Sequence, residues 1–302
     1  MNIYYISLGS FCYAKMAIRE TNREFKESLP FDFNSSPHLD GITRILKELY
    51  EKNTYEIELN EILEIYNQDE LSVSEKNMYL VHFFKTKDLK DLKKKINKFP
   101  VKAHEYIKED VINDVKKTFK KRFERLLNIL NDKNNILCFL RIENYDNFGW
   151  KNELLELTKV LSLFKNPNKY LLYAQNLIDD KLHFPTSHVL NYEFNFPILF
   201  YKYYFYDLEI INNKEHFLNL FIIFENIINN NNNVINIKSN NIIEKYYLNS
   251  NSMLIFKLTN LNYFSTYFME NDTLYINNVI SGYDKYIKNK DNIFESISKY
   301  NI

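Results

Sequence analysis

Apolar residues in the first two thirds of the chain follow two periods, one typical of strands and one typical of amphipathic helices. The clearest helix is predicted over Val111–Leu130, where apolar residues recur at three- and four-residue steps. The spacing of Leu59, Ile62 and Leu63 predicts a further helical segment. Strands are predicted for the β-rich apolar runs Asn2–Leu8, Met78–Phe84, Ile136–Ile142, Tyr170–Ala174 and Val189–Phe194. Strands that alternate with helices favour parallel pairing in a layered fold.

The pattern changes after the asparagine run Asn229–Asn233, beyond which short strand-like runs are separated by turn residues. We therefore predict an α/β fold with a mostly parallel sheet flanked by helices. A small antiparallel β appendage is expected near the C-terminus. The predicted division is an α/β domain over 1–228, an Asn-rich loop or linker over 229–236 and the β-rich appendage over 237–302.

Charge and hydropathy exclude several classes of partner. The 302 residues contain 39 Lys+Arg and 39 Asp+Glu, so the formal net charge is zero and gives no electrostatic footprint for nucleic acid. The Lys-rich stretch from Lys85 to Lys98 is interrupted by Asp88 and Asp91, and we interpret it as a solvated helix face. No stretch approaches the ~20 apolar residues of a membrane helix. We expect no nucleic-acid partner and no membrane association.

Cysteine usage and the N-terminus indicate a cytoplasmic location. Two cysteines, Cys12 and Cys138, are too few for a disulfide framework. The first ten residues lack a positive flank and a cleavage site, so they are interpreted as a strand and not as a signal peptide. Four glycines beside many Asn, Ile, Lys, Tyr and Phe indicate AT-rich codons. Such a bias fits a large DNA virus, in which case the location would be the host cytoplasm, or an AT-rich bacterium or a protist.

The strongest candidate for a reactive centre is Cys12, in the turn Gly9-Ser10-Phe11-Cys12 between the first strand and the first helix. Ligand sites collect at the carboxyl ends of parallel strands. A helix start stabilises a thiolate, and its free N–H groups could hold an oxyanion. The alternative is that Cys12 is a small buried hydrophobic residue. Cys138, inside an apolar strand, is predicted to be structural.

Candidate partners for the thiol are spread along the chain. His82 lies in the apolar strand MYLVHFF, where a histidine needs a polar role. Asp180 and His183 have an Asp-x-x-His spacing that some hydrolases use. Asp32, in Pro-Phe-Asp-Phe, is an acid among aromatic residues and should be paired or functional. Charges that need a carboxylate or a bound anion are carried by Arg122, Arg125 and Arg141.

No metal site or cofactor site is predicted. Cys12, Cys138 and the six histidines lack zinc-type spacing. Four scattered glycines cannot supply a Walker loop or a dinucleotide-binding fingerprint.

Five segments together resemble a known family: YISLGSFC, LPFDF, the strand with His82, KKRFERLLNIL and ILCFLRI. The chain is similar, over about residues 3–145, to a domain family described as "putative papain-like cysteine peptidases", found in bacteria and large DNA viruses. The family shows Ser-Leu-Gly-x-x-Cys, Pro-Phe-Asp-Trp, a strand histidine, an arginine-rich helix and a strand ending in arginine. This chain departs from it at Phe33, where tryptophan is usual, and at Phe83, where an acid can follow the histidine.

The resemblance implies a cysteine-dependent hydrolase or acyltransferase. In this interpretation Cys12 is the nucleophile, His82 the base and Asp32 the residue that orients it. Gly9, Ser10, Arg122, Arg125 and Arg141 would then bind a peptide, acyl or anionic small-molecule substrate.

Two alternatives stay open. The Gly-Ser-x-Cys turn after a first strand also resembles SGNH-type hydrolases and acyltransferases, with Ser10 as nucleophile and Asp180 and His183 as partners. Papain-like enzymes, by contrast, carry the cysteine on a central helix after a loop. The second alternative is a non-catalytic binding module in which the three arginines hold a phosphate or a sugar nucleotide.

Overall fold

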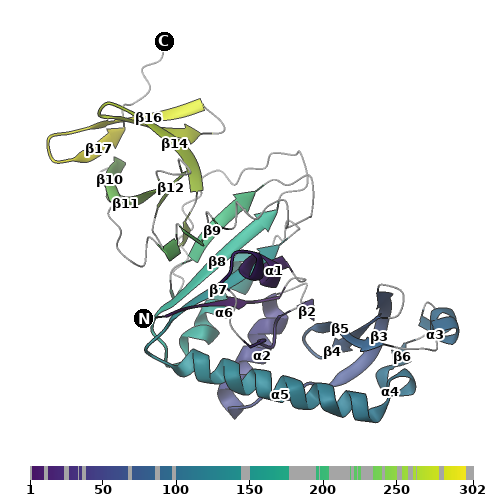
Figure 1. Ribbon diagram of the computed structural model, residues 1–302. Coiled ribbons are helices and arrows are strands. Elements are labelled where there is room, and N and C mark those ends of the chain that lie inside the picture. Colours follow the sequence, from purple (N-terminus) through teal and green to yellow (C-terminus); the bar gives the residue numbers. More distant parts are fainter. Residues whose placement is uncertain are drawn as a thin grey trace.

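In the computed structural model the chain forms three β-sheets, and the labelled helices lie around the first two (Figure 1). The structure describes residues 2–9, 13–23, 27–32, 34–35, 39–66, 70–85, 89–96, 100–143, 150–176, 195–196, 198–203, 218, 221–222, 224–225, 234–239, 242–249, 254–257, 261–262, 264–278 and 282–296. The predicted strand Val189–Phe194 and the asparagine run Asn229–Asn233 lie outside these residues.

The first sheet is parallel and has the order β1-β7-β8-β9-β13. Its strands are β1 (Ile3–Ser7), β7 (Ile136–Glu143), β8 (Lys169–Asn176), β9 (Ile198–Tyr203) and β13 (Leu261–Asn262). Ile3 pairs with Ile136 and Ile6 with Phe139, so the carboxyl ends of β1 and β7 meet at one edge. The prediction that these two segments share a sheet is confirmed.

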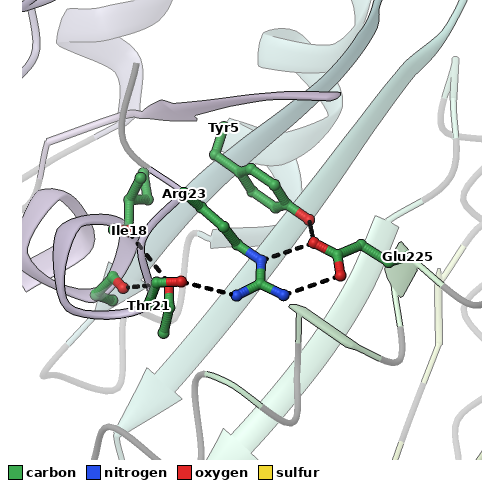
Figure 2. A network of polar contacts seen from close by, with 6 residues as sticks. Tyr5, Ile18, Thr21, Arg23 and Glu225 are labelled. Atoms are coloured by element: carbon green, nitrogen blue, oxygen red, sulfur yellow. Dashed lines mark hydrogen bonds and ion pairs between the residues drawn. The ribbon is translucent and has the colours of Figure 1, made fainter. Parts of the chain in front are cut away.

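Helices cover both faces of this sheet, which explains why β7 is an almost uninterrupted apolar run. On one face, Tyr5 of β1 meets Phe221 and Phe224 edge-on, and α1 (Tyr13–Glu20) lies on the same side (Figures 1 and 2). On the other face, Ile6 and Phe139 belong to the main core. That core also includes side chains of α2 (Leu39–Lys52), α5 (Glu109–Asn131) and α6 (Trp150–Ser162).

The second sheet is antiparallel and lies between β1 and β7 along the chain, with the order β2-β5-β4-β3-β6. Its strands are β2 (Asn34–Ser35), β3 (Leu59–Tyr66), β4 (Glu70–Glu75), β5 (Tyr79–Lys85) and β6 (Val101–Lys102). Two short helices, α3 (Leu89–Ile96) and α4 (Ala103–Tyr106), follow β5 and β6. The long helix α5 runs from this sheet back to the parallel sheet (Figure 1), and its Phe119 packs against Phe83 of β5.

The third sheet is formed by the C-terminal part of the chain. Its strands are β10 (Val234–Ser239), β11 (Ile242–Asn249), β12 (Leu254–Lys257), β14 (Phe264–Glu270), β15 (Thr273–Asn278), β16 (Gly282–Lys288) and β17 (Ile293–Ser296). Neighbours are antiparallel, except that β10 pairs with β17 in parallel and closes the sheet. The predicted antiparallel C-terminal part is confirmed, and β13 from the same part extends the parallel sheet beside β9.

Two expectations about the middle of the chain are wrong. The sheet content is not mostly parallel, because the Met78–Phe84 run forms β5 of an antiparallel sheet. A short apolar run fits either kind of sheet when helices cover it, and α5 covers β5. The predicted helix around Leu59 is strand β3, in which Ile62 is buried and Leu63 is exposed. No helix in the described part of the chain has the length and apolar character needed to cross a membrane.

Candidate functional site

The backbone leaves the carboxyl edge of the parallel sheet at Gly9. The Leu8 N–H donates to the Leu140 carbonyl at 2.9 Å, which extends the pairing of β1 with β7 by one residue. Gly9 then has a φ of 72°, a left-handed conformation that glycine adopts without steric cost. Helix α1 begins at Tyr13, while Ser10 and Cys12 lie outside the described residues. Gly9 therefore stands where the chain leaves the strand in a conformation that favours glycine.

Lys15, in the first turn of α1, forms a buried ion pair with Asp32. Lys15 Nζ lies 3.0 Å from Asp32 Oδ2, and the two side chains are only 4% and 3% exposed. The same oxygen accepts the Leu29 N–H at 2.9 Å, while the Asp32 N–H donates to the Leu29 carbonyl. Burial raises the pKa of Asp32, and the charge of Lys15 together with the Leu29 N–H opposes that shift. The pair joins the helix that follows Cys12 to the Pro-Phe-Asp segment.

Arg122 of α5 is the third charged member of this cluster. Its Nη1 is buried and has no hydrogen-bond partner among the described residues. The guanidinium carbon lies 5.3 Å from the centre of the Phe83 ring and 5.1 Å from that of Phe119. Burial lowers the pKa of Arg122, the nearby Asp32 carboxylate opposes this, and Arg125 lowers it further. Arg122 is therefore close enough to Asp32 for their charges to interact.

Helix α5 also holds the Pro-Phe-Asp segment by direct contacts. Phe123 packs edge-on against Phe31, with ring centroids 6.2 Å apart. Arg125 pairs with Glu27 and donates to the Ser28 carbonyl. The arginine-rich helix and the Pro-Phe-Asp segment are thus one packed unit.

Arg141 supports the strand end from which the Gly9 turn starts. It is fully buried on β7, and its Nη1 donates to the Leu8 carbonyl at 2.9 Å. The expectation that Asp32 and Arg141 each have a hydrogen-bond partner is confirmed: the partners are Lys15 and Leu29 for Asp32, and the Leu8 carbonyl for Arg141.

His82 occupies an irregular position in β5. Val73 of β4 pairs with Leu80, and Leu71 pairs with Phe84. Between these two pairs β5 advances by four residues while β4 advances by two, which is a β-bulge. The bulge is centred on His82, and bulges of this kind often re-aim a side chain next to a functional site. β5 also pairs with β2, which begins two residues after Asp32. The side chain of His82 lies outside the described part of the structure.

A second polar network lies at the other end of α1 (Figure 2). Arg23 donates from Nε and Nη2 to the two carboxylate oxygens of Glu225, at 2.7 and 2.9 Å. Its Nη1 donates to the Thr21 carbonyl, and the Tyr5 hydroxyl donates to Glu225 at 2.8 Å. Burial, together with Glu225, raises the pKa of Tyr5 well above its ordinary value. This network joins β1, the end of α1 and the helical residues around Glu225.

Cys138 lies behind this network on β7, as the register partner of Tyr5. Its thiol is free and fully buried, and burial raises its pKa well above the ordinary value. A thiol of this kind is unreactive. The structure agrees with the prediction that Cys138 is structural.

The structure brings some of the sequence-predicted residues together. Asp32 and Arg122 share one cluster, and Gly9 and Arg141 lie at one strand end. Asp180 and His183, like Ser10 and Cys12, lie outside the described residues. Lys15 was not predicted, although its position three residues before Ile18 places both on the buried face of α1.

In the described part of the chain, no group of three or more His, Cys, Asp or Glu side chains lies close enough to hold a metal ion.

Comparison with known proteins identifies one family. A family model described as "Putative papain-like cysteine peptidase (DUF1796)" matches residues 3–180. That range contains the whole cluster of Lys15, Asp32 and Arg122, and it ends before His183 and Glu225. No curated protein and no solved structure matches the chain.

Proposed function

Because the chain belongs to the family described as "putative papain-like cysteine peptidase", we propose that it is a cysteine-dependent hydrolase or acyltransferase whose nucleophile is Cys12. The substrate would be a peptide or another acyl compound. A reducing cytoplasm would keep such a thiol active, and the low cysteine count fits that location.

The observation that carries this proposal is the buried ion pair between Lys15 and Asp32. Lys15 is three residues after Cys12, and Asp32 belongs to the second family motif. A buried pair of charges is costly to desolvate and is retained where it fixes a specific geometry or serves a function. Here it fixes the first turn of α1, and with it the chain just after Cys12, against the Pro-Phe-Asp segment.

His82 is the proposed base. β2 begins two residues after Asp32, and its Asn34 pairs with Leu80, two residues before His82, so this pairing brings the two segments side by side. Among the described residues, both contacts of the Asp32 carboxylate fall on Oδ2, which leaves Oδ1 to accept an imidazole N–H. An acid in this place would orient the ring and stabilise its protonated form.

The reaction would proceed by acyl transfer to sulfur. The Cys12 thiol gives its proton to His82, and the sulfur forms a bond to the acyl carbon of the substrate. N–H groups at the start of α1 would hold the oxyanion of the tetrahedral intermediate. The bond to the leaving amine or alcohol then breaks, and that group takes the proton from His82. Water or a second acceptor finally releases the acyl group from Cys12.

The experiment is alkylation with iodoacetamide at pH 7, followed for each cysteine by mass spectrometry. Cys12 should react roughly ten-fold faster than a thiol of the urea-unfolded chain, since a lowered pKa increases the thiolate fraction. Cys138 should stay unmodified while the protein is folded. His82→Ala should slow the reaction of Cys12, whereas His104→Ala, an exposed histidine of α4, should leave it unchanged. Slow and equal modification of both cysteines would contradict the proposal.

A non-catalytic anion-binding module is the second candidate, and one observation favours it: the buried, unpartnered Nη1 of Arg122. Among the described residues, Arg125 and Arg141 already hold Glu27 and the Leu8 carbonyl. In such a module Arg122 would therefore be the main anion-binding residue of the three arginines. An unreactive Cys12 in a protein that still binds anions would favour this candidate. An unreactive Cys12 beside a Ser10 that a fluorophosphonate modifies would favour the SGNH-type alternative with Asp180 and His183.

A further inference from the structure

Arg122 presents a buried hydrogen-bond donor that the described protein atoms do not use. Nη1 carries two N–H groups, and leaving buried donors without an acceptor costs stability, more so when the group is charged. Native structures keep few such groups, and a bound ligand is one reason to keep one. The unused donor therefore points to a group that arrives from outside the chain.

The aromatic rings explain how the guanidinium is held without using that donor. Phe83 and Phe119 lie 5.3 and 5.1 Å from the guanidinium carbon, within the range of cation–π attraction. This attraction acts on the positive charge of the guanidinium and does not occupy the Nη1 donor, which has no hydrogen-bond partner among the described residues. Arg122 is thus held in place with a donor available for an acceptor.

The charges of the cluster indicate which kind of acceptor. Lys15 and Arg122 are positive and Asp32 is negative, while the neighbouring Arg125 has its own counter-ion, Glu27. Among the described residues of the cluster one positive charge remains, and the Nη1 atom with the unused donor is buried. A singly charged anion balances it, whereas a phosphate dianion would leave a buried negative charge. Carboxylate is also the planar group that an arginine fork binds best among monoanions.

We propose that Arg122 binds a carboxylate group of the substrate, so that the substrates are acyl compounds that also carry a free carboxylate. This assignment of substrate class rests on the proposed function of Cys12. It accounts for the charge of the cluster that no described residue balances.

A pair of alkylating reagents tests the assignment, because iodoacetate and iodoacetamide differ only in the carboxylate. The measured quantity is the ratio of their rate constants at Cys12 in the folded protein, divided by the same ratio at Cys12 in the urea-unfolded chain. This quotient cancels the reactivity of the thiol. The expected quotient is about ten, and a ten-fold preference for iodoacetate corresponds to about 1.4 kcal/mol.

Variants of α5 identify the residue responsible. Arg122→Gln should reduce the quotient to about one, and Arg122→Lys, which keeps the charge and loses the fork, should give an intermediate value. The matched control is Lys121→Gln, which removes an exposed positive charge from the same helix and should leave the quotient unchanged. A quotient near one in the unsubstituted protein, or a high quotient that survives in Arg122→Gln, would overturn the assignment.

A second readout separates this assignment from the proposed function. Acetate or succinate at constant ionic strength should raise the melting temperature of the protein, and more than phosphate does, with the effect lost in Arg122→Gln but not in Lys121→Gln. If Cys12 is unreactive and this stabilisation is present, the nucleophile is wrong and the carboxylate site stands. If Cys12 reacts quickly and neither the quotient nor the stabilisation responds to Arg122, the carboxylate site is wrong and the nucleophile stands.

Discussion

The two ends of helix α1 each meet a cluster of partly or fully buried charges, and the two clusters differ in completeness. At the C-terminal end, all three guanidinium nitrogens of Arg23 have acceptors, and both oxygens of Glu225 are used (Figure 2). At the N-terminal end, Lys15 and Asp32 are paired, while Arg122 Nη1 has no acceptor among the described residues. Counted over the described residues, one cluster is closed and neutral, and the other carries an extra positive charge and an unused donor.

The difference distinguishes polar groups that stabilise the fold from polar groups that are available to a ligand. A closed network rigidifies the fold and needs nothing further, whereas an incomplete network costs stability that only a ligand can return. The open cluster lies wholly within the part of the chain that matches the family model, residues 3–180. The closed cluster uses Glu225, which lies beyond that part, to fasten the later chain onto β1 and α1.

The largest effect is expected from breaking the buried pair of the open cluster. Asp32→Asn removes the carboxylate that pairs with the buried Lys15 charge and should lower the free energy of unfolding by about 3–5 kcal/mol. Urea denaturation measures the loss. The double variant Lys15→Met with Asp32→Asn should recover most of it, because the buried charge of Lys15 is then removed together with its counter-ion. A single variant as stable as the unsubstituted protein would show that the pair is not buried as described.

A smaller loss of stability is expected when the closed cluster is broken. Glu225→Gln removes the charge that Arg23 and Tyr5 share, and the pair is 15% and 29% exposed, so solvent screens part of the effect. The free energy of unfolding should fall by about 1–3 kcal/mol. The control is Glu295→Gln. Glu295 pairs with Lys238, and these side chains are 45% and 39% exposed, so this variant should lower the free energy of unfolding by under about 1 kcal/mol. Equal effects of the two variants would remove the distinction between a clamp and a surface pair.

Arg122 should behave in the opposite way from Arg23. Arg122→Met keeps the packing against the two phenylalanine rings and removes the unused donor and the extra charge. Stability should stay within about 1 kcal/mol of the unsubstituted protein or increase, while carboxylate binding is lost. A large loss of stability in Arg122→Met would make Arg122 a structural residue like Arg23, and the comparison between the two clusters would fail.

The smallest effect concerns Lys169, a third buried cation, at the opposite end of the parallel sheet. Its Nζ donates to the carbonyls of Phe164 and Asn166, and burial lowers its pKa to about 8. Since the unfolded chain binds this proton up to the ordinary value of 10.5, stability should rise with pH between about 8 and 10.5. Lys169→Met should flatten that rise. An unchanged pH profile in the variant would show that carbonyl contacts alone fully compensate the buried charge.

The sequence predicted local features better than their assembly. The Gly9 turn, the strands β1 and β7 and the helix over residues 111–130 follow from periodicity and from one informative glycine. The antiparallel pairing of β5 could not be read from MYLVHFF, because covered strands of either sheet type are apolar throughout. The pairing of Lys15 with Asp32 joins residues that are 17 positions apart, and only the packed fold places them together. The role of Glu225 likewise depends on a contact across 202 residues.

The measurement that tests the account most directly is the pH dependence of Cys12 alkylation by iodoacetamide, with Cys138 as the internal reference. If the open cluster and the start of α1 serve a thiolate, Cys12 should titrate with an apparent pKa at least about one unit below the ordinary ~8.5 of a free thiol. The apparent pKa should rise in His82→Ala, while Cys138 stays unmodified until the protein unfolds. An ordinary or raised apparent pKa for Cys12, unchanged in His82→Ala, would contradict the account.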